Sequence, residues 1–525
     1  MNDLVEKAEK AFEESSKDSL ADKLVEEVEN SDALLFHDDF GDSYVAIHGN
    51  GKLVFKLPSK GFQRWLARHV WDELRKAPPR EAIKTAIRVL EGKALFDGPC
   101  CELHVRLTQF EDAIWYDLGN GTAIQIDTSG WRIIDEPPIL FKSFPHQVSQ
   151  VLPTKNGSLE RLCDFFNLED EKDRLLIQIY TVAAFIPGFP HPILVFYGPQ
   201  GSGKTTPHRL LKSLIDPSIL KTLSAPDKLP EFVQLASHHQ FLFLDNLSSL
   251  PGWLSDALAR ACTGDGFSKR ELYSNDEDFI YCFQRTIALN GINLVVQKAD
   301  LLDRSILVGL KHIPKEKRLV EKELLKKFEQ EKPAILGAIF DTVPKALSEY
   351  PKVSLPEYPR MADFTRWGCA IARALGYQDR DFLSAYLANV TEQNEAALEA
   401  SPVGTAIIAF IEDNNPWKGT ATELLTKLEL LSEKLKININ SKYWPKDPAR
   451  LSKKIQLVES NLAEQGIEVI RDDKARPRVI EILKTSKNTD GTDGSVGAKP
   501  GVPSKPDGAD ASDSKSEQSD QGWPK

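Results

Sequence analysis

One nine-residue stretch constrains the fold more than any other part of this 525-residue chain. Residues 198–206 read Gly-Pro-Gln-Gly-Ser-Gly-Lys-Thr-Thr and fit the P-loop pattern G-x-x-x-x-G-K-[ST] in full. The apolar residues 193–197 before it have the composition of a buried strand, and residues 209–215 after it have the apolar spacing of a helix. A strand, a glycine-rich turn and a helix in this order predict an α/β domain that binds a nucleotide.

The residue types in this loop suit a phosphate chain. Glycines let the main chain wrap around an anion, and the start of the following helix favours negative charge. Lys204 would reach the β- and γ-phosphates, and Thr205 would hold Mg²⁺ through its hydroxyl. We therefore predict ATP and Mg²⁺ as cofactors, with contacts from Gly198, Pro199, Gln200, Gly201, Ser202, Gly203, Lys204, Thr205 and Thr206.

A second apolar strand, 241–244, runs into Asp245, which is typical of a Walker B acid that orients Mg²⁺. Asn246 follows, where many such ATPases have Glu. An amide can hold a water molecule, but it cannot take a proton from it near neutral pH. The identity of the general base therefore stays open.

Two further polar residues mark the next strands. Asn290 follows the apolar residues 286–289 and is placed to hold the attacking water, although Asn290-Gly291 is also a strong turn signal. Arg304 precedes the apolar strand 306–310, where ring ATPases keep an arginine finger, although an isolated Arg is more often a solvated surface charge. The order of the four elements favours a ring-type ATPase over a small-molecule kinase.

These motifs resemble the superfamily 3-like, AAA+-related ATPases of phage, plasmid and poxvirus primase-helicases. The resemblance covers about residues 35–485 and is strongest at 193–310. It implies that residues 261–273 lead into a hairpin facing the channel of a ring, where Lys269 and Arg270 would contact DNA. The same two charges also fit an ordinary surface turn.

The resemblance extends to both flanks of the ATPase. Residues 115–131 resemble the small β-rich module that precedes it in the family, and residues 360–367 resemble the helical segment that follows. No acidic polymerase triad stands out in the first 150 residues. A separate primase or polymerase would then be a partner, and the family implies a homo-oligomer, usually a hexamer.

Residues 401–485 predict a winged helix, with helices at 403–411, from 420 and from 444 to about 464, and then a hairpin. Thr420 and Glu423 have the spacing of a capping box. Residues 442–478 hold nine Lys or Arg against six Asp or Glu, a net charge of +3. A winged helix that binds only protein fits this composition as well. We predict duplex DNA contacts from Lys446, Arg450, Lys453 and Lys454 on the third helix and from Lys474, Arg476 and Arg478 on the wing.

Charge and cysteine usage limit the remaining classes. The chain has a net charge of −11, so its overall charge does not indicate nucleic-acid binding. Residues 1–30 and 486–525 carry −6 and −2 of it, which leaves the middle nearly neutral. Six cysteines without a CxxC predict reduced thiols. The N-terminal residues lack the apolar stretch of a signal peptide, so we expect a cytoplasmic protein. Prolines and glycines interrupt the apolar stretch 175–197, so we expect no membrane span there.

The predicted fold class is multidomain α/β: a P-loop, AAA+-like ATPase on a mostly parallel sheet, with an N-terminal α+β module and a C-terminal winged helix. The expected divisions are a helical N-terminus (1–30), the module (31–150), the ATPase (151–345), a helical lid (346–400), the winged helix (401–485) and a disordered tail (486–525).

The function expected from these features is that of a ring-forming DNA helicase of a mobile-element replication system. It would hydrolyse ATP between subunits and move along a single strand in its channel. Two alternatives remain open. One is an ATP-dependent initiator or regulator that binds DNA without unwinding it, and the other is an interaction scaffold with weak ATPase activity, for which Asn246 is the best hint.

Overall fold

The computed structural model describes residues 19–49, 51–75, 77–168, 170–247, 250–264, 266–270, 278–281, 283–291, 296, 298–314, 316, 320–399, 401–441, 444–472 and 477–485. The predicted disordered tail, the first 18 residues, Lys474 and Arg476 lie outside this part of the chain. The side chains of Lys269 and Arg270 are likewise outside it.

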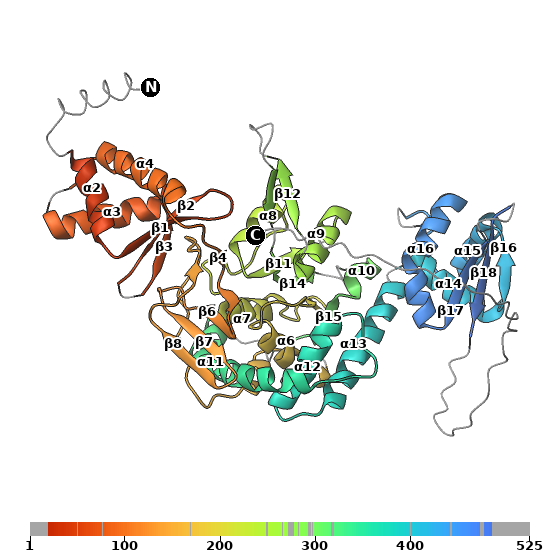
Figure 1. Cartoon of the computed structure of the whole chain (residues 1–525). Coiled ribbons are helices and arrows are strands. Elements are labelled where there is room, and N and C mark those ends of the chain that lie inside the picture. Colours follow the sequence, from red (N-terminus) through yellow and green to blue (C-terminus); the bar gives the residue numbers. More distant parts are fainter. Residues whose placement is uncertain are drawn as a thin grey trace, which may run out of the picture. The chain divides into compact units, whose positions relative to one another are not determined.

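A four-stranded parallel sheet forms the centre of the fold, in the order β11-β14-β10-β15. Figure 1 labels β11, β14 and β15 of this sheet. Its strands are β10 (Ile193–Tyr197), β11 (Phe241–Leu247), β14 (Thr286–Gly291) and β15 (Ser305–Gly309). The apolar residues of each strand are buried on both faces, as in strands of a covered parallel sheet. Asn290 and Gly291 continue β14 instead of forming a turn.

Helices pack on both faces of this sheet. Successive side chains of a strand point to opposite faces, so Leu194 and Phe196 enter one hydrophobic cluster while Ile193 and Val195 enter another. The sequential helices are α6 (Lys172–Ala183), α7 (Thr205–Ile215), α8 (Leu229–His238), α9 (Gly252–Thr263), α10 (Ala299–Leu302), α11 (Glu321–Glu349), α12 (Ala362–Ala374) and α13 (Asp379–Glu399). The apolar stretch 175–197 is a buried helix followed by a buried strand, and no helix of the described residues could span a membrane.

The segment before the central sheet contains two separate sheets. The first is antiparallel, with β1 (Ala33–His37), β2 (Ser43–Ile47) and β3 (Leu53–Lys56), and it packs with α2 (Leu20–Asn30), α3 (Lys60–Leu74) and α4 (Arg80–Phe96) around its own core. The second is the antiparallel meander β5 (Leu107–Phe110), β6 (Ala113–Asp117), β7 (Ala123–Asp127) and β8 (Gly130–Ile134). The short strands β4 (Leu103–His104) and β9 (Leu140–Phe141) pair beside them.

The hydrophobic core does not divide at residue 150, where the sequence suggested the end of the N-terminal module. Ile114, Tyr116, Ile124 and Ile126 of the meander belong to the same buried cluster as α6, α7 and α11. The Tyr116 ring lies 5.2 Å from the ring of Phe185 and 5.6 Å from that of Phe340. The meander is therefore packed as part of the central core.

Three helices and a small sheet make up the end of the described chain. They are α14 (Pro402–Asp413), α15 (Ala421–Lys434), α16 (Pro448–Glu464) and the strands β16 (Trp417–Gly419), β17 (Ile467–Asp472) and β18 (Val479–Lys484), paired in the order β16-β18-β17. Strand β16 was not predicted. Helix α16 begins at Pro448 with Asp447 as its cap, so Lys446 precedes the helix instead of lying on it.

Candidate nucleotide site

The glycine loop, residues 198–203, joins β10 to α7 with main-chain angles that favour glycine. Gly198, Gly201 and Gly203 have φ angles of +148°, +85° and +77°, which side chains with a Cβ rarely adopt. A Cβ on Gly198 would lie 2.5 Å from the main-chain oxygen of Leu310. Close packing of the loop against the sheet therefore requires glycine at this position.

Lys204 folds back over this loop. Its ammonium donates hydrogen bonds to the main-chain oxygens of Gly198 (2.8 Å) and Pro199 (3.0 Å). Partial burial lowers the pKa of Lys204, since these neutral carbonyls compensate less than an anion would. The loop thus holds a half-buried cation that has no carboxylate partner in the described chain.

Side chains from helix α7 and from strands β11 and β14 meet next to Lys204. The Thr205 hydroxyl donates to the Asp245 carboxylate at 3.1 Å, and the Asn290 amide is 3.5 Å from the same hydroxyl. Asn290 also accepts a hydrogen bond from the main-chain N–H of Asn246 at 2.6 Å, which holds Asn246 at a φ of +57°. The cluster therefore links four residues whose sequence positions are up to 85 apart.

This cluster can hold a hydrated divalent cation. Thr205 and Asp245 offer a hydroxyl and a carboxylate oxygen, the hard donors that Mg²⁺ prefers. Thr205 directly follows Lys204, so a metal ion held by Thr205 and Asp245 would lie close to phosphates bound by the lysine. The residues present fit this ion.

Arg304 lies at the opposite end of the sheet from the glycine loop. Its main-chain oxygen accepts from Ile193 at the start of β10, while the loop follows Tyr197 at the end of that strand. Four residue steps of strand separate the two points by about 13 Å. In the described residues, no hydrogen bond or ion pair joins Arg304 to the loop.

Carboxylates hold Arg304 within its own chain. Its guanidinium pairs with Asp300 one turn earlier and donates to the main-chain oxygen of that residue at 3.2 Å. Arg360 pairs with both Asp300 and Asp303, so two arginines share this acidic pair. Arg304 remains partly exposed, with 23% of its side-chain surface accessible.

Four basic residues predicted to contact DNA line a pocket at the start of α16. Trp444, Pro445 and Leu457 form its apolar part, and Lys446, Arg450, Lys453 and Lys454 form its rim. Asp447 caps the helix and lies 3.2 Å from the guanidinium of Arg450, so part of the positive charge is compensated. Arg478, just before β18, is exposed.

Two side chains close to predicted site residues, His208 beside Lys204 and Arg360 beside Arg304, were not themselves predicted as site residues. His208 lies one helical turn after Lys204, and its ring Nδ1–H donates a hydrogen bond to the main-chain oxygen of Lys204 at 3.0 Å. The four-residue spacing on a helix is a signal that could have found it. Arg360 contacts residues 57 and 60 positions away, a distance that no local pattern reveals.

Two models of one protein family match the chain. The model described as "Actinomycete integrative conjugative element replication protein" matches residues 157–395, and the model described as "AICE RepA C-terminal domain" matches residues 403–498. Together they cover more than half of the chain, including the glycine loop, the central sheet and α14 to β18. No curated protein matches.

Solved structures show a more distant likeness. The structure titled "SCCmec type IV Cch - active helicase" is 11% identical, has a TM-score of 0.44, and is matched over 86% of this chain and 92% of that one. A structure titled as the apo A form of the NrS-1 C-terminal region is 14% identical, has a TM-score of 0.39, and is matched over 88% and 99%. At these scores the likeness is too general to assign an activity.

Proposed function

This chain belongs to the family of actinomycete integrative conjugative element replication proteins, and from that premise we propose that it is an ATP-driven, ring-forming DNA helicase. The observation that carries the proposal is the meeting of Lys204, Thr205, Asp245 and Asn290 at the end of a glycine loop. This combination suits phosphoryl transfer, in which a lysine and a metal stabilise phosphate charge and a polar group orients water.

Each side chain has a separate part in the proposed reaction. Lys204 would exchange its two loop carbonyls for phosphate oxygens, which are stronger acceptors because they are charged. Thr205 and Asp245 would hold Mg²⁺, which would neutralise charge that develops on the phosphates. Asn290 would orient the attacking water, and its bond to the main chain of Asn246 keeps its amide in place.

Arg304 would act on the nucleotide of a neighbouring subunit. Its position about 13 Å along the sheet from its own loop argues against a role in its own site. Exchange of the Asp300 carboxylate for a phosphate of the neighbour would free the guanidinium for the transition state. A homo-oligomeric ring, a hexamer by family resemblance, satisfies this geometry.

DNA would be held at two places on this proposal. The antiparallel hairpin β12 (Phe267–Arg270) and β13 (Asp278–Tyr281) carries Lys269 and Arg270, which would contact a single strand in the channel. The helices α14 to α16 with strands β16 to β18 would act as a winged helix, with the basic pocket on α16 facing duplex phosphates. Priming would come from a separate primase or polymerase.

Lys204→Ala tests the nucleotide site. The change removes the one cation of the loop, so we expect ATP hydrolysis to be lost and ATP binding to weaken, while the fold persists. Steady-state hydrolysis and nucleotide affinity measure the two effects. Lys345→Ala, at an exposed position of α11, is the control and should behave as the unchanged protein. Turnover near the normal rate in folded Lys204→Ala protein would refute the assignment.

Mixing two inactive variants tests the action between subunits. Arg304→Ala should bind ATP normally and lose about 10³-fold or more in hydrolysis, which is at the low end of what a finger contributes. Its P-loop is intact, and the Lys204→Ala protein has an intact Arg304. Mixed oligomers should therefore contain complete composite sites and recover part of the activity. If co-assembled subunits recover none, Arg304 does not act on a neighbour.

Asn246 favours a second candidate, an ATP-dependent initiator or regulator that remodels DNA without unwinding it. An exposed amide replaces the carboxylate that would take a proton from water, which would slow hydrolysis. Strand separation on a forked duplex distinguishes the two candidates. Hydrolysis stimulated by single-stranded DNA without strand separation would favour the second.

A further inference from the structure

A strongly basic segment lies far from the nucleotide site, in the first part of the chain. Residues 52–93 contain eleven Lys or Arg against four Asp or Glu, a net charge of +7 in a protein whose total is −11. This exceeds the +3 of residues 442–478. The segment forms β3, α3 and α4, which Figure 1 shows in the orange part of the chain.

The charges on α3 follow one face of the helix. Lys60, Arg64 and Arg68 are spaced by four residues, and Trp71 continues the line three residues later; Arg75 is the left-handed C-cap residue directly after the helix. All five are exposed. Residues spaced by three or four lie above one another on a helix, about one turn apart. From Lys60 to Trp71 the row extends about 16 Å along the helix axis.

The opposite face of α3 fixes this orientation. Phe62, Leu66 and Val70 are buried in the core shared with α2, α4 and β2. The helix begins at Ser59, whose hydroxyl accepts from the main-chain N–H of Phe62 at 3.2 Å. Because these apolar residues hold the helix against its sheet, the basic row must face outward.

Little negative charge compensates this row. Arg68 lies 3.6 Å from Asp72, and both side chains are largely exposed, so the pair is screened by water. Glu73 is exposed nearby. In the described part of the chain, Lys60, Arg64 and Arg75 have no carboxylate within ion-pair distance. A row in which Arg68 alone has a carboxylate partner among the described residues creates a local positive field in an acidic protein.

Helix α4 adds a second row with the same spacing. Arg80, Lys84 and Arg88 are exposed at intervals of four residues, while Ala86, Ile87, Leu90 and Ala94 of the same helix are buried. Glu81 compensates in part, since it lies 3.0 Å from Lys84. The two helices are consecutive along the chain, so α4 adds further exposed cations to the basic segment 52–93.

Trp71 is the feature that identifies the ligand. Its side chain is 48% exposed between Arg68 and Arg75, whereas Trp65 on the same helix is packed against Phe62 and His69 at ring distances of 5.8 and 4.9 Å. An exposed indole costs hydrophobic free energy and offers a flat surface on which a base can stack. Bases are free to stack in this way in a single strand, where cations also follow the backbone.

We propose that the outward face of α3, extended by α4, is a binding surface for single-stranded DNA. Lys60, Arg64, Arg68 and Arg75 would neutralise successive phosphates, and Trp71 would stack on a base between them. This proposal shares with the proposed function only the premise that the chain binds DNA. It adds a contact outside the channel hairpin and outside α16, where an unwound strand could be held.

The test compares two substitution sets in the full chain. Arg64→Gln/Arg68→Gln/Arg75→Gln removes three charges from the row and keeps side-chain length. Arg132→Gln/Lys345→Gln/Arg380→Gln removes three exposed charges elsewhere and serves as the control. Binding of an oligothymidine strand is measured without nucleotide over a range of salt concentrations. We expect the row variant to bind at least tenfold more weakly at low salt, with a salt slope shallower by about 2, because each lost phosphate contact accounts for about 0.7.

Trp71→Ala tests the stacking contribution separately. We expect binding of the oligothymidine strand to weaken about fivefold or more, with its salt slope unchanged, because no charge is lost. All these positions are exposed, so the unfolding temperature should stay near that of the unchanged protein. Equal weakening by the control set, or no weakening by the row variant, would overturn the proposal.

Two further outcomes are decisive. A row variant that weakens only duplex binding, with Trp71→Ala silent, would overturn the single-strand assignment in favour of duplex. ATP hydrolysis without DNA should be unchanged in both variants, and a loss there would mean that the face serves the ATPase. If Lys204→Ala protein still hydrolysed ATP, the proposed ATPase function would be wrong. The oligothymidine measurement would still test the α3 surface, because it is made without nucleotide.

Discussion

His208 lies on α7, one helical turn after Lys204, and is fully buried. Its imidazole stacks on the ring of Phe243 at 4.1 Å and meets the edge of Phe196 at 4.6 Å. Burial lowers the pKa of His208 to about 3, because a charged imidazolium would lose its hydration among these rings. The residue is therefore neutral in the folded protein at any pH near neutrality.

Acid should weaken the fold through His208. The unfolded chain binds a proton near pH 6.5 and the folded chain only near pH 3, so stability is complete above pH 6.5 and falls as the pH drops through that window. The loss from this residue is about 2 kcal/mol between pH 6.5 and pH 5. His208→Asn should remove that part of the pH dependence, measured by urea unfolding at pH 7 and pH 5. Exposed His312→Asn is the control, and an unchanged pH dependence in His208→Asn would contradict the prediction.

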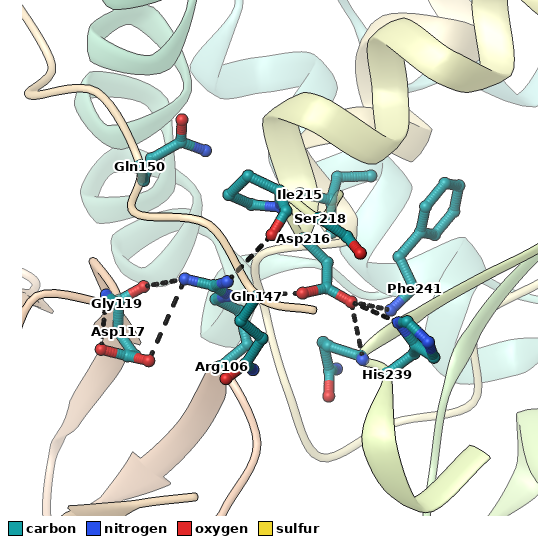
Figure 2. Close-up of polar contacts among 12 residues, drawn as sticks. Arg106, Asp117, Gly119, Gln147, Gln150, Ile215, Asp216, Ser218, His239 and Phe241 are labelled. Carbon is teal, nitrogen blue, oxygen red and sulfur yellow. Dashed lines mark hydrogen bonds and ion pairs between the residues drawn. The ribbon is translucent and has the colours of Figure 1, made fainter. Parts of the chain in front are cut away.

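At the scale of the element, a buried cluster of charges fixes the end of helix α7. Figure 2 shows the guanidinium of Arg106 between Asp117 and Asp216, with Asp216 turned toward the main chain of β11. Asp216 accepts from Lys212 at 2.6 Å, from Arg106 at 3.3 Å and from the main-chain N–H of Phe241 at 3.3 Å. The cluster joins α7, which begins at the glycine loop, to the strand that carries Asp245.

Opposing effects act on the pKa of Asp216. Burial alone would raise it, but the charges of Lys212 and Arg106 hold the pKa well below its usual range. The folded carboxylate therefore contributes stability above the pKa of the unfolded chain, and this contribution is lost only as the pH falls toward the lower folded value. Near neutral pH the cluster is fully formed.

Asp216→Asn should strongly destabilise the protein, by about 3–5 kcal/mol, because it leaves Lys212 and Arg106 buried without their shared carboxylate. The unfolding temperature measures this effect. Exposed Asp227→Asn provides the control and should change stability little. Adding Lys212→Met to Asp216→Asn should recover part of the loss, since it removes one of the unpaired charges. Equal unfolding temperatures for Asp216→Asn and the control would show that the cluster does not stabilise the fold.

At the scale of the whole molecule, the two N-terminal sheets differ in how they depend on the centre. The sheet β1 to β3 packs with α2, α3 and α4 in a core of its own. The meander β5 to β8 shares the central core, and Tyr116 donates its hydroxyl to the last turn of α7 at 3.2 Å. Removal of the first sheet and removal of both should therefore have different consequences.

A chain that begins at residue 103 should remain folded and hydrolyse ATP, whereas one that begins at residue 151 should aggregate. The second truncation uncovers the apolar surface that Ile114, Tyr116, Ile124 and Ile126 occupy, and each such side chain contributes about 1.5–3 kcal/mol. Yield of soluble protein and circular dichroism compare the two. A folded, active chain beginning at 151 would show that the meander is a separate module.

Local sequence patterns predict many of the helices and strands without any knowledge of tertiary contacts. The residues 193–197, 241–247, 286–291 and 305–309 form strands at the expected places because short apolar runs are buried on both faces of a parallel sheet. Thr420 and Glu423 form the expected capping box at the start of α15, with hydrogen bonds of 3.2 and 2.7 Å. Both features depend on neighbours within a few residues.

The start of α16 and the strand β16 were predicted less well. Residues 444–447 contain two features typical of a helix start, a proline and an acidic cap, and only the main-chain geometry places the cap at Asp447 and not at Trp444. Strand β16 has three residues and pairs with β18, more than 60 positions later. Three residues are too few to show the alternation of apolar and polar residues that predicts a strand. The pairing with β18 is what makes this segment a strand.

By itself the sequence determined the nucleotide loop, the strands around it and the residues at their ends, because each depends on residue types at close spacing. Tertiary structure alone decided that Thr205, Asp245 and Asn290 meet, that Arg304 lies about 13 Å along the sheet from its own loop, and that the meander belongs to the central core. These outcomes depend on which buried faces pack together. Alternating apolar residues predict that one face of a strand is buried, but they do not predict which element covers it. The covering element is determined only when the whole chain folds.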